Sequence, residues 1–161
     1  MNKKIRIGCA SGFWGDTDIA APQIIEKGNV DYLVCDYLSE VTMSILSRAK
    51  LKSSEHGYAK DFINHVGPLL KTIKQNKIKV ISNAGGVNLD ACKKALSNKA
   101  KKENINLKII TVEGDDLSGI QKDLQKMSIK EIDSGKKLPE NLLSINAYLG
   151  APGIKRALDL G

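Results

Sequence analysis

The sequence predicts a single α/β domain over residues 1–161, with a mostly parallel sheet flanked by helices in a Rossmann-like, three-layer arrangement. The first observation is that short apolar runs alternate with longer segments whose apolar residues recur at helical spacing. The second is that the run over 78–82 is apolar on both faces, as in buried parallel strands. The third is that five strand-like runs are visible, whereas a closed barrel needs about eight. We therefore expect an open, doubly wound sheet.

The first half of the chain is expected to contain three strands with helices between them. Gly28 ends the first helix, and Ser39 is a candidate cap for the second. Gly67 and Pro68 interrupt a longer apolar pattern, which predicts a kink or two abutting helices. In order, the expected elements are a strand over 5–10, a helix over 18–27, a strand over 30–35, a helix after Ser39, a helical stretch over 62–73 and a strand over 78–82.

The second half is expected to continue the same alternation. The segment over 128–139 is polar and lysine-rich, with Ser134 and Gly135 as a turn signal, so a mobile excursion and a small hairpin both remain open. The expected elements are a helix capped by Asn88, a strand over 107–112, a helix over 117–127, a strand over 142–147 and a helix over 154–160.

The last residues, Asp159–Gly161, have the character of a helix C-cap at a point where the next strand of an α/β protein would begin. An open sheet edge would be left there. We therefore expect the chain to be truncated, as the N-terminal part of a longer protein, with a natural terminus as the alternative.

The composition fits an ordinary globular core rather than a membrane protein. Apolar residues make up 42% of the chain and aromatic residues 4%, so aliphatic side chains must fill most of the core. No apolar run approaches the roughly 18 residues that cross a bilayer. Arg6 interrupts the first apolar run, so a secretory leader is not indicated. We expect a cytoplasmic location and no membrane partner.

The net charge of +7 comes largely from lysines on and after one predicted helix. No aromatic residues interleave them, so we favour a solvated face over nucleic-acid binding and expect no nucleic-acid partner. A field favourable to an anionic metabolite is a milder interpretation. The cysteines Cys9, Cys35 and Cys92 have no metal-type spacing and are interpreted as buried small hydrophobes. The lysines on and after the predicted helix, which supply most of the net charge, are Lys93, Lys94, Lys99, Lys101, Lys102 and Lys108.

Polar or glycine-rich turns follow all five expected strands. The carboxyl ends of parallel strands meet at one edge of a sheet, and ligands of open α/β proteins bind there. The opposite edge receives plainer connections, such as 27–29 and 75–77. The sequence therefore predicts one site, formed by the turns 11–16, 36–40, 83–88, 113–116 and 146–150.

Substrate-binding candidates come from these turns. Glycines let backbone approach a ligand closely, and the turn over 83–86 precedes a helix, where backbone N–H groups bind anions. A tight turn with Asn88 as N-cap is the alternative, because no dinucleotide or P-loop motif is present. Trp14 either lines the pocket or packs down its own loop. Tyr148 either donates a hydrogen bond to a substrate oxygen or has a structural role. The candidates are Ser11, Gly12, Trp14, Asn83, Gly85, Gly86, Asn88, Asn146 and Tyr148.

Carboxylates are the catalytic candidates. Asp36 is the first choice for acid–base work, because burial at the end of a strand favours the protonated form of a carboxyl group. Glu40 is the second choice, and Asp16 the third. Together with Asp115 these acids also form a possible oxygen site for a divalent cation such as Mg²⁺, or they simply interact with helix dipoles. No other cofactor is evident.

Five segments of the chain resemble the acyclic terpene utilisation protein A family. Together they run in order through nearly the whole sequence. The family pattern has a glycine before the Asp-Tyr-Leu segment, where this chain has Cys35, and this departure bears on how closely that turn approaches a ligand. The segments are Arg6–Gly8 with Ala10–Asp16, Asp36–Met43, Gly57–Phe62, Asn83–Asn88 and Asn146–Ala151.

The resemblance implies a longer protein with a role in the catabolism of branched or terpenoid acids, handled as acyl-CoA thioesters. We expect a metabolic enzyme, or its N-terminal part, that binds a small carboxylate or acyl-CoA. A hydratase or lyase step suits carboxylates and amides without a redox cofactor motif. The alternative is a non-catalytic ligand-binding or assembly subunit that requires the rest of the protein or a partner subunit. A homo-oligomer is expected.

Overall fold

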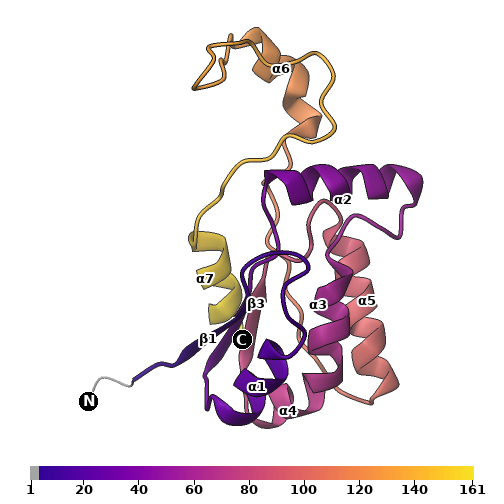
Figure 1. Ribbon diagram of the computed structural model, residues 1–161, viewed down its shortest axis with the longest axis vertical. Coiled ribbons are helices and arrows are strands. Elements are labelled where there is room, and N and C mark those ends of the chain that lie inside the picture. The colour runs from indigo at the N-terminus through magenta and orange to yellow at the C-terminus, as the bar shows by residue number, and fades with distance from the viewer. Residues whose placement is uncertain (1–3) are drawn as a thin grey trace.

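The computed structural model describes residues 4–161, so residues 1–3 of the expected domain lie outside the described part (Figure 1). An open parallel sheet has the order β1–β2–β3. Its strands are β1 (Ile7–Ser11), β2 (Tyr32–Cys35) and β3 (Lys79–Ser82). Helices lie on both sides of this sheet, so the predicted α/β class is confirmed.

One face of the sheet is covered by the helices of the first two thirds of the chain. Leu33 in the central strand is fully buried there. A Cβ on Gly8 would lie 2.5 Å from Ile24, so α1 packs directly on β1. The predicted interruption at Gly67 is confirmed as a 3₁₀ turn between two abutting helices. The elements are α1 (Ala20–Lys27), α3 (Lys60–Val66), η1 (Gly67–Leu69), α4 (Leu70–Gln75) and α5 (Leu89–Lys102).

The opposite face is covered only in part. Helix α7 (Pro152–Asp159) lies beside it, and Lys79 of β3 donates from Nζ to the Leu158 carbonyl at 2.9 Å (Figure 1). Ile7 of β1 is 67% exposed. The sheet is therefore closed by helices on one face and more open on the other.

Helix α2 (Glu40–Lys52) lies across the end of the sheet at which the strands finish (Figure 1). Its Leu46 is buried. Ser39 occupies the predicted cap position, but its hydroxyl makes no cap bond and instead lies 3.3 Å from the Thr42 hydroxyl. The expected capping by Ser39 is therefore wrong, although the helix begins where predicted.

The expected fourth and fifth strands are not formed in the described part of the chain. Ile105, Leu107 and Ile109 alternate inward and pack on the core, yet their backbone makes no ladder with β3. The segment over 142–147 instead runs antiparallel to residues 115–117, with a bridge between Asp116 and Asn146. Both predictions are wrong because apolar alternation detects an inward-facing extended segment, not its hydrogen-bonding partner.

Residues 113–150 form an arm that extends beyond α2 (Figure 1). It carries η2 (Ser118–Ile120), α6 (Gln121–Lys126) and a small antiparallel hairpin closed by a bridge between Lys130 and Lys137. The hairpin confirms one of the two expectations for this segment. No described side chain after Ala100 is fully buried, so the arm has no core of its own.

Two of the three cysteines are buried as predicted. Burial raises the pKa of the Cys35 thiol and of the Cys92 thiol to about 11. Cys9 is exposed, so the prediction of burial is wrong for that residue. It lies on the sheet face that the helices leave more open, which explains the difference. Within residues 4–161, each helix is too short or too polar to cross a membrane.

The central strand should carry a large share of the stability. Replacing Leu33 with alanine should lower the free energy of unfolding by about 2–5 kcal/mol, because it leaves a cavity in a packed core. Urea unfolding measures this loss. Ile7→Ala is the matched control, since Ile7 is mostly exposed on the neighbouring strand and should cost far less. An equal cost for the two variants would contradict the described burial.

The buried thiols should make the fold sensitive to alkaline pH. The thiols of the unfolded chain ionise near their ordinary pKa of 9.0, before those of the folded state, so this stability is fully present below that pH and is lost above it. Between about pH 8 and about pH 10 each buried thiol should contribute a loss of about 1 kcal/mol. Cys92→Ala should flatten this pH dependence in urea unfolding more than Cys9→Ala, because Cys9 is exposed and only adds to the effect of burial on the pKa of Cys35.

Candidate functional site

Three of the five predicted turns meet at one edge of the sheet. Because β1, β2 and β3 are parallel, the turns that follow them lie at their common carboxyl-terminal end. We call this end the carboxyl edge, formed by residues 11–16, 36–40 and 83–88. The geometric expectation for the first three strands therefore holds.

Asn83 joins the second turn to the third. Its Oδ1 accepts a hydrogen bond from the Tyr37 N–H at 2.8 Å, and its Nδ2 donates to Asp36 Oδ1 at 2.7 Å. The first turn is joined to the second through the backbone, since the Asp36 N–H donates to the Ser11 carbonyl at 3.1 Å. One amide side chain thus fixes both the backbone and the carboxylate at the end of the central strand.

Asp36 is oriented but open to solvent. Its Oδ1 accepts from Asn83 and, at 3.3 Å, from the Leu38 N–H. Its Oδ2 has no hydrogen-bond donor among the described residues. The structure exposes Asp36, so the burial on which its predicted acid–base role partly depended is absent. What remains is a carboxylate with one fixed oxygen and one available oxygen.

Asp16, unlike Asp36, has both carboxylate oxygens bound within its own turn. Its two carboxylate oxygens accept from the Gly12 N–H at 2.9 Å and the Thr17 N–H at 2.7 Å. These backbone hydrogen bonds, the one from Gly12 first, hold the pKa of Asp16 below its usual value. Asp16 therefore closes the turn over 11–16. Trp14 is half-buried against the core, whereas Phe13 is 60% exposed.

The turn after β3 is shaped by packing. Gly86 has a φ of +54°, and a Cβ there would lie 2.5 Å from Leu46 and 2.6 Å from the Gly57 carbonyl. Glycine is required at this point by both the backbone conformation and the close approach of α2. Gly85 lies one residue earlier in the same turn, where a Cβ would lie 3.0 Å from the Leu89 side chain.

Asn88 caps α5, which is the structural one of its two predicted roles; the other was substrate binding. Its side-chain oxygen accepts from the Ala91 N–H at 3.3 Å. Its amide also donates to the carbonyls of Ser54 at 2.7 Å and His56 at 2.6 Å. All these bonds are internal to the protein, which favours the structural interpretation of Asn88.

The arm brings the remaining candidates beside α2. Tyr148 is 96% exposed and donates from its hydroxyl to Glu40 Oε1 at 3.3 Å. Asn146 donates to Asp115 Oδ2 at 2.9 Å, within the antiparallel stem of the arm. These residues arrive through the arm rather than through a fifth strand of the sheet.

The four carboxylates proposed as cation ligands are held apart by these separate partners. Asp36, Glu40 and Asp115 each bond to a different side chain, and Asp16 bonds to its own turn. Within residues 4–161 no group of three or more His, Cys, Asp or Glu side chains is arranged to hold a metal ion.

A buried polar cluster beneath the edge includes one residue that the sequence analysis missed. Burial, and next the Cys35 thiol, raise the pKa of Tyr37 to about 12, while the Ser11 hydroxyl acts in the opposite direction. The Ser11 hydroxyl is buried and has no hydrogen-bond partner among residues 4–161, so its approach to Tyr37 lacks hydrogen-bond geometry. Such a hydroxyl costs about 1–3 kcal/mol. The sequence feature that could have identified Tyr37 is its position just after a buried strand.

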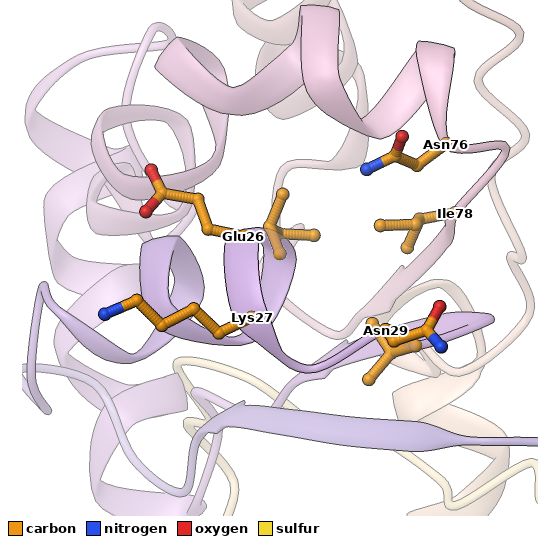
Figure 2. A pocket seen from close by; sticks show the side chains of 7 residues that line it. Glu26, Lys27, Asn29, Asn76 and Ile78 are labelled. Carbon is orange, nitrogen blue, oxygen red and sulfur yellow. The ribbon is translucent and has the colours of Figure 1, made fainter.

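A hollow of about 310 Å³ lies at the other edge of the sheet, not at the carboxyl edge (Figure 2). Asn29 and Asn76 lie on the two sides of Ile78, while Glu26 and Lys27 extend away (Figure 2). It lies where α1 and α4 end, and the C-terminal end of a helix disfavours an anionic ligand. We therefore keep the candidate site for acids at the carboxyl edge. A second hollow, of about 520 Å³, lies around α6.

The hydrogen bond between Asp36 and Asn83, which joins the second turn to the third, can be tested by exchanging the two side chains. Asn83→Asp should lower the free energy of unfolding by about 1–3 kcal/mol at neutral pH, because two carboxylate oxygens then face each other. The double variant Asp36→Asn with Asn83→Asp restores the donor–acceptor pair and should recover most of that loss in urea unfolding. No recovery in the double variant would show that the hydrogen bond between the two side chains does not hold the edge.

Comparison with known proteins agrees with the family resemblance described in the sequence analysis, which also runs through nearly the whole chain. The family model described as acyclic terpene utilisation family protein AtuA matches residues 5–161. No curated protein and no solved structure matches the chain. Since the match covers nearly all of the sequence, the chain belongs to the AtuA family and has a role in acyclic terpene utilisation.

Proposed function

We propose that this chain is a metabolic enzyme, or the N-terminal part of one, that acts on a small branched or terpenoid carboxylic acid or its acyl-CoA thioester. Family membership supports the class of acid. The reaction we propose is a hydration, dehydration or related lyase step, in the cytoplasm. The observation that carries the proposal is the Asp36 carboxylate, fixed at the end of the central strand with Oδ2 available.

The geometry of Asp36 suits proton transfer. A general base must be held within reach of the proton that it removes, and the Asn83 amide fixes the carboxylate without neutralising its charge. In a dehydration, Asp36 removes the proton from the carbon next to the acyl carbonyl. The electron pair forms the carbon–carbon double bond as the bond between the next carbon and its hydroxyl group breaks, and the hydroxide takes the proton back from Asp36 and leaves as water.

The remaining candidates take supporting roles in this proposal. Glu40, backed by the Tyr148 hydroxyl, is a second carboxylate near the same edge. Gly12, Trp14, Gly85 and Asn146 line the approach of the substrate. The proposal needs neither a redox cofactor nor a nucleic-acid partner, and two of the α5 lysines pair instead with Glu55 and Glu103.

A second candidate function is a ligand-binding or assembly subunit that becomes active only with a partner or as a homo-oligomer. The arm favours this candidate, because its apolar side chains are exposed. Met127 is 69% exposed, Leu143 53% and Ile132 94%. An arm without a core of its own is typical of a segment that packs on another surface.

Asp36→Asn tests the proposed chemistry. It should lower turnover of a branched acyl-CoA, measured by chromatography of the thioester, at least about a hundredfold, the usual contribution of a general base. It should change urea unfolding little, because asparagine still accepts from Asn83. The exchanged variant, Asp36→Asn with Asn83→Asp, is the matched control: it keeps the pair but moves the carboxylate, so turnover should stay low.

The outcomes separate the two candidate functions. Unaltered turnover in Asp36→Asn, or loss of folding as large as the loss of turnover, would exclude the catalytic role of Asp36. Binding of the thioester without turnover in the wild-type chain would favour the subunit that requires a partner.

A further inference from the structure

The last residues of the three strands form one row across the carboxyl edge. Ser11 of β1 pairs with Cys35 of β2 after a register shift between Cys9 and Ser11, and Cys35 is in register with Ser82 of β3. Residues in register on neighbouring parallel strands direct their side chains to the same face of the sheet. Ser11 and Ser82 therefore occupy corresponding positions on the two sides of Cys35.

The two serine hydroxyls differ in their partners. Ser82 Oγ donates to the Cys35 carbonyl at 2.7 Å and accepts from the Ala84 N–H at 3.0 Å, so it serves the fold. Ser11 is only 5% exposed, and its Oγ lies near the Cys35 thiol and the Tyr37 hydroxyl but has no partner with hydrogen-bond geometry among the described residues. A buried hydroxyl without a partner is uncommon and indicates a group whose partner comes from outside the fold.

Tyr37 lies beside this hydroxyl. Its ring packs edge-on against Phe62 of α3, with the centroids 6.2 Å apart, and its backbone N–H is held by Asn83. Burial raises the pKa of Tyr37 to about 12, so the phenol keeps its proton at neutral pH and is able to donate. The carboxyl edge thus offers two neutral O–H donors next to each other, with Asp36 adjacent in the chain.

We propose that the Ser11 hydroxyl, together with the Tyr37 hydroxyl, binds the acyl carbonyl oxygen of the substrate. This inference rests on the proposed function and names the group that the site recognises. Two neutral donors suit a carbonyl oxygen, which has two lone pairs. When Asp36 removes the neighbouring proton, negative charge develops on that oxygen, and fixed donors stabilise it there.

The turn over 12–16 follows Ser11 directly, and in this proposal it controls access to the Ser11 hydroxyl. The hydrogen bonds described for this turn stay within residues 12–19, namely those of Asp16 with Gly12, Phe13 and Thr17 and that of Thr17 with Ile19. Gly15 has a φ of +90°, a conformation that glycine adopts without strain. A shift of this turn would break no hydrogen bond to the other two turns, although it would move Trp14, which packs on the core, and in this proposal it lets a carbonyl group reach Ser11 Oγ.

The paired serines allow a direct test. Citronellate and citronellyl-CoA serve as probes for a terpenoid acid and its thioester, with the dissociation constant measured by calorimetry and stability by urea unfolding. Ser11→Ala should weaken binding about tenfold, the loss of one good hydrogen bond, without lowering stability. Ser82→Ala is the matched control and should lower stability while the folded protein binds as the wild type does. Tyr37→Phe keeps the ring against Phe62 and should also weaken binding.

Each outcome decides one point. Wild-type affinity in Ser11→Ala overturns the assignment of the hydroxyl and leaves the proposed function standing. Lower stability in Ser11→Ala shows that the hydroxyl serves the fold, which also overturns the assignment. If the wild-type chain binds neither probe, the proposed function fails, and this inference fails with it.

Discussion

The two hydrogen bonds of Asn83 are the interaction on which the candidate site depends. Parallel pairing brings the ends of β2 and β3 to one edge, but pairing alone does not orient the side chains there. Asn83 adds that orientation by holding the Tyr37 backbone with one atom and the Asp36 carboxylate with another. A single amide thus connects the sheet, the buried phenol and the exposed acid, so a change at Asn83 acts on all three.

The sequence alone predicted the fold class and the meeting of the first three turns at one edge of the sheet, because both follow from local patterns. Apolar runs of strand length alternate with segments of helical period, and polar turns follow the strands. Gly67 and Pro68 interrupt the helix where the structure has η1, and Asn88 caps α5 as its residue type suggests. In these positions the backbone preference of the residue and the tertiary structure agree.

The parts that the sequence did not predict depend on contacts between distant segments. The stretch over 142–147 has the pattern of a strand, but its partner is residue 116 in the arm rather than β3. The contact of Tyr148 with Glu40 spans more than a hundred positions and leaves no local signal. Ser11 and Ser82 are the same residue type at corresponding strand ends, yet only one has partners. No spacing rule distinguishes them, because the difference comes from three-dimensional packing.

The carboxylates near the site share one electrostatic property. Asp36 is held by an amide, Asp115 by an amide and Glu40 by a phenol, all of them neutral donors. A lysine or arginine would favour the charged form of each acid and make it a poorer proton carrier. The ion pairs described for this basic chain lie elsewhere, on α5, on α6 and on α7. The three carboxylates are thus oriented by neutral donors, and Lys50, a cation beside the turn after β3, is held by the Val87 carbonyl instead.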